Sequence, residues 1–388
     1  MSAEAPRPAV TTFSDEENMF REMIRDFAEA EIRPLASRMD HEAKMDPALV
    51  AKLGELGLLS IEVPEEHGGS AGTFFMSCVA VEEISRVDAS VGVLVDVQNT
   101  LFVNAIKCWA SKDLATEIYA KLVSGSVASY CLSEAGSGSD AFGLACRAEA
   151  TEDGYVLNGQ KLWITNAAEA GVFLVFANLH PSRGYKGITA FIVDRDTPGL
   201  SIGKKEDKLG IRASSTCEVV FENVKVPRSR LLGEEGRGYK IAIETLNEGR
   251  IGIGAQMVGI CRAGLEYATQ YTQEREQFGK PIAANQGVQF QLARMATQTE
   301  LARLAVYNAA RLRDAGQPFL REACIAKLAS SEAAEQITSM AIELHGGYGF
   351  TREYPVEKLF RDAKVGKIYE GTSNMQLQTI AKTLVGKM

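Results

Sequence analysis

The sequence predicts a mainly α-helical protein with a β domain in the middle of the chain. Hydrophobic residues recur at helical spacing towards both ends, and between these parts they form short runs broken by glycine, proline and aspartate. The length of 388 residues suits two or three domains. We therefore predict three domains, over residues 1–128, 129–232 and 233–388.

The first domain is expected to consist of helices. Ser14 and Glu17 form a capping box that starts the first helix. Asp46 and Pro47 are typical of an N-cap and a first-turn proline, and so predict the start of another helix. The apolar stretch 74–109 contains no proline and is expected to be buried helix.

The middle domain is expected to be a small β sandwich or barrel. Segments 155–157 and 161–165 flank Asn158 and Gly159, a dipeptide that predicts a hairpin turn. Further short runs follow at 172–177, 188–193 and 218–221. Several short strands so close together favour a sandwich or barrel.

In the third domain, hydrophobic residues again recur at helical spacing. Long, alanine-rich, amphipathic segments cover 239–272, 283–315 and 319–344, and a last helix is expected over 374–384. Gly316 and Pro318 separate the second segment from the third. Long neighbouring helices with short connections favour an antiparallel bundle.

The composition excludes several classes of protein. The net charge of −8, from 42 basic and 50 acidic residues, argues against binding to nucleic acid. Seven scattered cysteines without a CxxC pair indicate free thiols in a reducing compartment, and four isolated histidines give no metal-binding pair. We expect no membrane-spanning segment and no secretory signal, and therefore a soluble intracellular protein.

The common nucleotide and hydrolase motifs are missing from the sequence. It has no GxGxxG after a strand, no GxxxxGK[ST] and no GxSxG. The regular alternation of strands and helices that those folds require is missing too. We therefore do not expect a Rossmann dehydrogenase, a P-loop NTPase or an α/β-hydrolase.

Two segments in the middle domain are candidate ligand contacts. Residues 130–140 combine glycines with serines, which lets a backbone approach a ligand closely, although the segment also suits a plain turn. Trp163 and Thr165 fall on one face of a strand. They suit either a core position or a platform that stacks on and hydrogen-bonds to a flat ring.

Two further candidates lie in the last domain. Residues 343–350 place three glycines within four residues after a helix, which suits either a ligand contact or an elaborate helix–helix turn. Glu370 is a lone carboxylate between apolar residues and a glycine. Burial would raise its pKa towards that of a general base, although it also suits a residue that complements the following helix N-terminus.

Taken together, these segments resemble the acyl-CoA dehydrogenase family. The patterns CLSEAGSGSDAFG (131–143) and ELHGGYGFTREYPVEKLFRD (343–362) match with their spacing intact, and the likeness covers essentially the whole chain. The resemblance implies an N-terminal helical domain, a middle β-barrel or sandwich domain and a C-terminal four-helix bundle. It also implies non-covalently bound FAD, oxidation of an acyl-CoA to the trans-2-enoyl-CoA, electron transfer to electron-transfer flavoprotein, and a homotetramer.

The resemblance assigns roles to individual residues. Glu370 matches the catalytic base, whose backbone N–H helps to stabilise the enolate together with a hydroxyl of FAD. FAD contacts in the same subunit are expected from Tyr130, Cys131, Leu132, Ser133, Glu134, Ala135, Gly136, Ser137, Gly138, Ser139, Trp163, Ile164, Thr165, Thr372, Ser373 and Asn374. Contacts to the FAD of a neighbouring subunit are expected from Arg275, Gln286, Glu343, Leu344, His345, Gly346 and Gly347. Substrate contacts are expected from Ser139, Tyr185, Tyr239, Asn247, Glu248, Gly249, Arg250 and Gly371.

One alternative within the family concerns the base. Isovaleryl- and long-chain-type members carry it immediately before the arginine that corresponds to Arg250, where this chain has Gly249. Glu248 lies one residue away, a rotation of about 100° on a helix, and is expected to point elsewhere. Glu370 therefore remains the predicted base.

The whole-chain likeness is to short/branched-chain members, which act on 2-methylbutyryl-CoA and related thioesters. A straight short-chain (butyryl-CoA) dehydrogenase, a flavin oxidase of the same fold and a non-catalytic flavoprotein remain alternatives. A bacterial cytoplasm, or a mitochondrial matrix for a processed chain, is the expected location.

Overall fold

The computed structural model describes residues 9–386, and its first part is helical. The helices are α1 (Asp15–Phe27), α2 (Arg33–Glu42), α3 (Pro47–Glu55), α4 (Phe74–Ser85), α5 (Ala89–Asp96), α6 (Asn104–Trp109) and α7 (Lys112–Val123). The predicted capping box is confirmed, because the Ser14 hydroxyl accepts a hydrogen bond from the Glu17 N–H (3.1 Å) while the Ser14 N–H donates to the Glu17 carboxylate (3.0 Å). Asp46 caps α3 as predicted, accepting from the Ala48 N–H at 2.9 Å.

The prediction of uninterrupted buried helix over 74–109 is wrong at one point. The stretch is buried almost throughout, but the chain leaves the helix after Ser85 and restarts with Asp88 as an N-cap. The Asp88 carboxylate accepts from the N–H groups of Ser90 (2.8 Å) and Val91 (3.1 Å). Asp88 therefore starts a new helix at a point where the hydrophobic pattern shows no break.

The middle part is one bent sheet. Its strands are β1 (Val127–Cys131), β2 (Arg147–Ala150), β3 (Gly154–Thr165), β4 (Ala170–Asn178), β5 (Ile188–Asp194), β6 (Leu200–Lys205), β7 (Thr216–Pro227) and β8 (Leu231–Leu232). Their order is β6-β7-β3-β2-β4-β5-β8, and β1 pairs in parallel with β4. The two halves face each other across a core, where Tyr155 of β3 meets Phe191 of β5 with ring centroids 4.9 Å apart. This agrees with the sandwich-like domain that the sequence predicts.

The predicted hairpin turn at Asn158 and Gly159 is wrong. Both residues lie inside the continuous strand β3, which pairs with β2 on one side and β7 on the other. The pairing with β7 shifts register here, and the Asn158 side chain accepts from the Asn223 N–H at 2.8 Å. A Cβ atom on Gly159 would lie 2.7 Å from the Cys146 Cα, so the glycine permits close strand packing rather than a turn.

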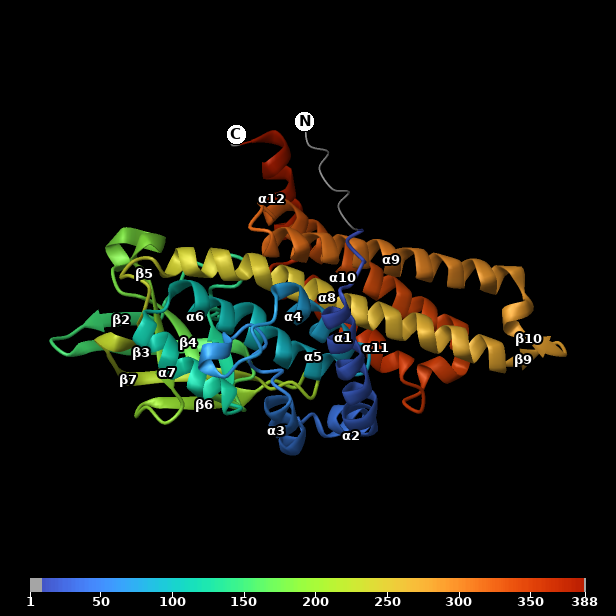
Figure 1. Ribbon diagram of the computed structural model, residues 1–388, viewed down its shortest axis with the longest axis horizontal. Helices are drawn as coiled ribbons and strands as arrows, with labels where there is room; N and C mark the ends of the chain where they lie inside the picture. Colours follow the sequence, from blue (N-terminus) through green and yellow to red (C-terminus); the bar gives the residue numbers. More distant parts are fainter. Residues whose placement is uncertain (1–8, 387–388) are drawn as a thin grey trace.

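The last part contains the longest helices. These are α8 (Gly238–Glu274), α9 (Gln286–Asp314), α10 (Leu320–His345), α11 (Val356–Ala363) and α12 (Ser373–Val385), with a small hairpin of β9 (Glu276–Gln277) and β10 (Lys280–Pro281) between α8 and α9. Figure 1 shows α8, α9 and α10 running along the molecule, with the β9–β10 hairpin at the end opposite the β domain. Helix α12 packs on α10, completing the predicted bundle. The sequence pattern did not predict α11 or the hairpin.

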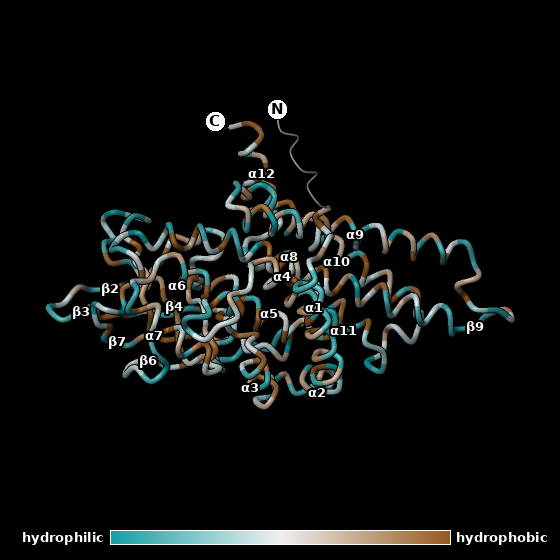
Figure 2. Tube along the Cα trace, in the orientation of Figure 1, coloured by the Kyte–Doolittle hydropathy of each residue, from teal (hydrophilic) through white to brown (hydrophobic). Residues whose placement is uncertain are grey.

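Two apolar cores meet at the β domain. Alternate residues of β4 point to opposite sides: Val172, Leu174 and Phe176 join the core of the helical parts, whereas Phe173 and Val175 join the core inside the sheet. A strand buried on both faces is apolar throughout, which explains the run at 172–177. Figure 2 shows hydrophobic residues along the inner helices and hydrophilic ones at the outer end of β3.

Two general properties of the described residues bear on function. By length and composition alone, Ala89–Trp109 could cross a membrane, but its most apolar window is entirely buried inside the protein, as in a core helix. Within residues 9–386, no group of three or more His, Cys, Asp or Glu side chains could hold a metal ion.

Candidate active site

Glu370 lies in the turn that precedes α12 and faces helix α8. Its backbone has a φ of 50° and Gly371 follows with 87°, so two consecutive residues are in the left-handed region. On α8, a Cβ atom placed on Gly249 would lie 2.8 Å from a Glu370 carboxylate oxygen and 2.7 Å from a methyl carbon of Leu101. Only glycine at this position leaves room for the carboxylate. The two positions where the family can carry its base therefore meet in space.

The surroundings of Glu370 suit a general base. One of its carboxylate oxygens is buried and has no hydrogen-bond partner among the described residues. Burial raises the pKa of Glu370 to about 7, while the positive charges of Arg250 and Lys327 oppose the rise. A carboxylate with a pKa near neutrality and a free oxygen can accept a proton from a substrate.

Glu370, which could also complement the N-terminus of the following helix, is not the N-cap of that helix. Thr372 is the N-cap of α12, and its hydroxyl accepts from the Met375 N–H at 3.4 Å. The Ser373 hydroxyl beside it is buried and has no partner among residues 9–386, so it is available to a ligand.

The Glu248 carboxylate on α8 faces Arg313 instead of Glu370. Its carboxylate accepts from the Arg313 guanidinium at 2.9 Å, and Arg313 also pairs with the buried Glu62 at 3.4 Å. Burial raises the pKa of Glu248 to about 7. The helical rotation between positions 248 and 249 turns this carboxylate away from Glu370, as the sequence predicted.

Two other predicted substrate residues meet each other. Tyr185, in the loop before β5, and Tyr239, in the first turn of α8, pack edge-to-face with ring centroids 5.0 Å apart. Further along α8, the Arg250 guanidinium donates to the Asn247 side chain at 2.6 Å. Ser139 lies in the exposed loop after β1.

The segments 130–139 and 163–165 lie side by side. The Leu162 N–H donates to the Ser133 carbonyl at 2.9 Å, and the Ser129 hydroxyl donates to the Thr165 carbonyl at 2.9 Å. Trp163 stands at a bulge of β3 with a φ of 58° and is 52% exposed, so the interpretation of this tryptophan as a core residue is wrong. Its exposed ring can stack on a flat ligand.

Parts of the 130–139 segment hold the fold rather than face a ligand. Cys131 is fully buried, and the Glu134 carboxylate is bonded to the buried Lys161 ammonium (2.6 Å) and the Ala145 N–H (2.6 Å). A Cβ atom on Gly136 or Gly138 would meet nothing within 4 Å, which leaves one face of the loop open. The residues that hold the turn are therefore different from the glycines on its open face.

The predicted cross-subunit residues gather at a different place. The His345 ring stacks on Tyr271 with centroids 4.2 Å apart, and the Arg275 guanidinium lies 5.7 Å from the Tyr348 ring centroid. Gly346 has a φ of 61° and open space where a Cβ would stand. Arg275 follows α8 directly beside the β9–β10 hairpin, at the end of the molecule opposite the β domain (Figure 1). A single chain therefore does not bring these residues to the β domain.

Two buried residues of the site escaped sequence reasoning. The fully buried Lys327 donates to the Gly371 carbonyl at 2.7 Å. The fully buried Gln376 donates to the carbonyls of Glu370 (3.1 Å) and Gly371 (2.9 Å). A signal for Lys327 existed, because it falls at helical spacing between Ala323 and Ala334 on the buried face of α10.

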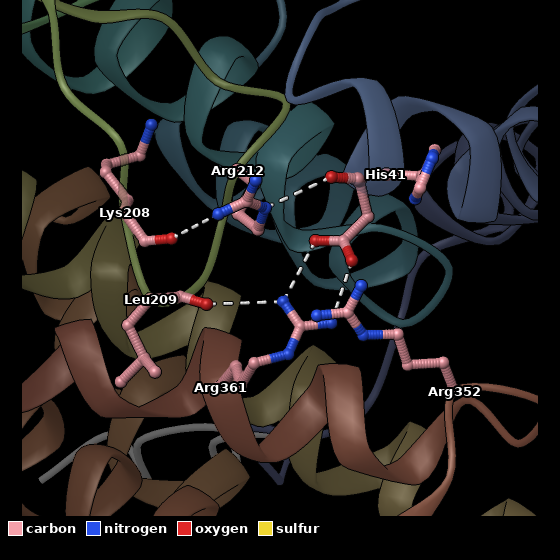
Figure 3. Close-up of a pocket in the computed structure, with 7 residues that line it drawn as sticks. His41, Lys208, Leu209, Arg212, Arg352 and Arg361 are labelled. Carbon is pink, nitrogen blue, oxygen red and sulfur yellow. Dashed lines mark hydrogen bonds and ion pairs between the residues drawn. The ribbon is translucent and has the colours of Figure 1, made fainter.

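A cationic cavity of about 260 Å³ lies elsewhere, between α2, the loop after β6 and α11. Figure 3 shows the side chains of Arg212, Arg352 and Arg361 gathered around this cavity. Arg361 binds Asp40 through two hydrogen bonds of 3.1 and 2.7 Å, and Arg212 pairs with Asp207 at 2.7 Å. The Arg361–Asp40 pair joins the first and last parts of the chain, and Arg212 of the middle part donates to the Asp40 carbonyl at 3.2 Å. No residue predicted from the sequence as a site residue lines the cavity.

Comparison with known proteins places this geometry in a family. The N-terminal, middle and C-terminal domain models of acyl-CoA dehydrogenase match residues 14–126, 129–224 and 236–385. The chain is 53% identical over 377 residues to the "Probable short/branched chain specific acyl-CoA dehydrogenase" of Dictyostelium discoideum, covering 97% of this chain and 91% of the relative.

Comparison with solved structures supports the same family. Butyryl-CoA dehydrogenase from Megasphaera elsdenii superposes with a TM-score of 0.95 at 40% identity, covering 96% of this chain and 99% of that one. A chain from the structure described as "Electron transferring flavoprotein of Acidaminococcus fermentans: Towards a mechanism of flavin-based electron bifurcation" gives 0.96 at 38% identity, covering 97% and 100%. With the helical, β and helical parts in the same order and Glu370 against Gly249, this chain belongs to the acyl-CoA dehydrogenase family.

Proposed function

We propose that this protein is an FAD-dependent acyl-CoA dehydrogenase that converts short or 2-methyl-branched acyl-CoA into the trans-2-enoyl-CoA, with Glu370 as the catalytic base. The single observation that carries the proposal is the buried, partner-free carboxylate oxygen of Glu370, whose pKa burial raises to about 7. Family membership and the short/branched-chain relative support the substrate class.

The chemistry needs one proton acceptor. The bond between the substrate α-carbon and its hydrogen breaks, the proton passes to the free Glu370 oxygen, and the electron pair forms the new carbon–carbon double bond. FAD, when bound, supplies the acceptor for the β-hydrogen that leaves with its electron pair. The Glu370 N–H would stabilise the enolate oxygen, because a donor fixed in advance by the turn needs no reorganisation during the reaction.

The residues present fit FAD. The exposed ring of Trp163 offers a stacking surface, and the space above Gly136 and Gly138 admits a ligand close to the backbone. The buried, partner-free hydroxyl of Ser373 offers a further hydrogen bond. Arg275, Gln286 and the segment 343–347 would hold the FAD of a neighbouring subunit, because they lie too far along the bundle to serve the β domain of their own chain (Figure 1).

On the substrate side, the Tyr185–Tyr239 pair and the Asn247–Arg250 pair are proposed to contact the acyl-CoA. We propose a homotetramer, electron-transfer flavoprotein as the electron acceptor, and a location in a bacterial cytoplasm or, for a processed chain, a mitochondrial matrix. The three-domain division at 1–128, 129–232 and 233–388 belongs to the same proposal. A straight-chain butyryl-CoA dehydrogenase is the second candidate, favoured by the likeness to the Megasphaera elsdenii enzyme.

Anaerobic reduction of the bound flavin tests the proposal. The purified protein should be yellow, and 2-methylbutyryl-CoA or butyryl-CoA should bleach its long-wavelength band. Comparison of butyryl-, isobutyryl-, 2-methylbutyryl- and hexanoyl-CoA then separates the branched from the straight substrate. Bleaching by none of them would contradict the proposal and leave the non-catalytic flavoprotein, and fast reoxidation by oxygen would identify an oxidase.

A pair of variants then locates the base. Glu370→Gln should retain FAD and abolish bleaching, whereas Glu248→Gln removes the competing carboxylate of α8 and should still bleach. The reverse pattern would place the base at position 248. Sedimentation at the assay concentration measures the number of subunits.

A further inference from the structure

The turn that carries Glu370 is strained and needs support. Glu370 has a φ of 50°, and a non-glycine residue in the left-handed region costs free energy that the surrounding structure has to offset. Its carboxylate lies against Gly249, so a small movement of the turn would bring the two into contact or leave a gap. The turn therefore has to be fixed by groups outside it.

Lys327 is one such group, and its surroundings are unusual for a lysine. Its ammonium is fully buried and donates to the Gly371 carbonyl at 2.7 Å. No carboxylate of the described residues lies within ion-pair distance of it. A buried ammonium that is not neutralised by a direct partner is costly, and burial lowers the pKa of Lys327 to about 8, with the charge of Glu370 acting against this decrease.

Gln376 is the second group. It lies in the first turn of α12 and is fully buried, and its amide nitrogen donates to the carbonyls of both Glu370 and Gly371. A Cβ atom on Gly371 would lie 2.8 Å from this nitrogen, so the glycine lets the amide approach. Two side chains from two helices thus hold both carbonyl groups of the turn.

Several ionisable groups sense the charge of Glu370. From α8, α10, α5, β1 and the preceding residue these are Arg250, Lys327, Asp96, Tyr130 and Tyr369. Burial raises the pKa of Asp96 well above its ordinary value, which favours its neutral form. Arg250 is only partly buried and bonded to Asn247, whereas Lys327 is screened from solvent completely. Both positive charges favour the ionised form of Glu370, with Arg250 the larger influence and Lys327 the second.

We propose that Lys327 and Gln376 are positioning residues for the reaction, which hold the Glu370–Gly371 turn by its two carbonyls. Lys327 has a second role: together with Arg250, its buried positive charge extends to lower pH the range in which Glu370 can accept the substrate proton. The inference rests on the proposed role of Glu370 as the base and extends it to two residues that contact the backbone of its turn.

The test measures flavin reduction by saturating butyryl-CoA in the FAD-loaded enzyme, between pH 5.5 and 9, by anaerobic stopped flow. Lys327→Met removes both the donor and the charge. It should slow reduction by about tenfold and move the acid limb of the pH profile upwards by about one pH unit, because an opposite charge favours the ionised carboxylate. Lys327→Arg keeps the charge and should retain the acid limb near its original position. Gln376→Met removes only the neutral donor, so it should slow reduction without moving the acid limb.

Three controls make the outcome decisive. Ser331→Ala removes the buried hydroxyl that bonds the carbonyls of Gly366 (2.9 Å) and Lys327 (2.7 Å), while leaving the Lys327 side chain intact. It should lower the thermal midpoint without changing the pH profile. The carboxyl infrared band that Glu370→Gln abolishes reports protonation of Glu370 directly, and it can be titrated in the FAD-free protein of each variant. If Lys327→Met does not fold, Lys327→Gln replaces it and should move the acid limb alone.

The inference would be overturned if every Lys327 variant kept the wild-type acid limb of the pH profile. It would also be overturned if Ser331→Ala slowed flavin reduction as much as the Lys327 variants do. Failure of the proposed function is distinguishable, because then the wild-type protein would not be reduced by acyl-CoA or Glu370→Gln would remain active. Retention of FAD and an unchanged KM for butyryl-CoA separate positioning of the base from loss of a binding site.

Discussion

Gly249→Ala should impair catalysis through a contact with the base. The added Cβ would lie 2.8 Å from the Glu370 carboxylate oxygen and 2.7 Å from the Leu101 methyl carbon, where ordinary contacts begin at 3.4 Å. The carboxylate must therefore retreat by about 0.6 Å, and since a displacement of about 1 Å can cost about a hundredfold in rate, we expect a loss of about tenfold or more. Overpacking of this kind should lower the free energy of unfolding by about 1–3 kcal/mol.

Stopped-flow flavin reduction at saturating acyl-CoA measures the loss in rate, and urea unfolding measures the loss in free energy of unfolding. Gly264→Ala on the same helix is the matched control, because its added Cβ meets an Ile337 methyl group at 3.1 Å and lies away from the carboxylate. It should keep the wild-type rate. A Gly249→Ala enzyme that reduces its flavin at the wild-type rate would refute the argument, because Glu370 could then not be held against α8 in the working enzyme.

Three further predictions concern binding, stability and pH. Tyr185→Ala removes one ring of the edge-to-face pair that is proposed to contact the acyl-CoA, so it should raise KM with little change in kcat, measured by steady-state kinetics. Lys161→Met leaves the buried Glu134 carboxylate without its partner at 2.6 Å, so urea unfolding should show a loss of about 3–5 kcal/mol. Burial raises the pKa of Glu370 to about 7 from 4.5, so the folded protein binds the extra proton and stability falls as pH rises between these values. Glu370→Gln should therefore stabilise the FAD-free protein by about 2–3 kcal/mol at pH 8 and change little at pH 4, and equal gains at both pH values would contradict the assigned cause.

The parts of the fold that local chemistry decides were predictable from the sequence. The caps at Ser14 and Asp46 depend on residues within one helical turn, and both predictions were confirmed. The turn predicted at Asn158 and Gly159 was wrong because β2 and β7, which are distant in sequence, pair along both sides of this strand. Pairing with remote partners overrides a local turn preference.

The residues of the site also divide into those that the local sequence predicts and those that depend on distant contacts. The position of Glu370 was predicted from a motif, and its raised pKa was predicted from burial between apolar neighbours. Lys327 was not predicted, because its role depends on a contact with Gly371, 44 residues further along the chain. Glu248 was assigned by its position in a motif, whereas the structure turns its carboxylate to Arg313 on another helix.

The shared apolar core has a consequence for how the chain can be divided. Side chains of β4 such as Val172 and Leu174 pack into the same core as the helices on both sides of the β domain in sequence. A fragment cut at the family-model boundaries would expose this apolar surface to water. We expect calorimetry to record one unfolding transition for the whole chain, and domain exchange between relatives to fail unless both sides of the contact are transplanted together. Each family-model domain is therefore smaller than the cooperative unit in which the chain folds.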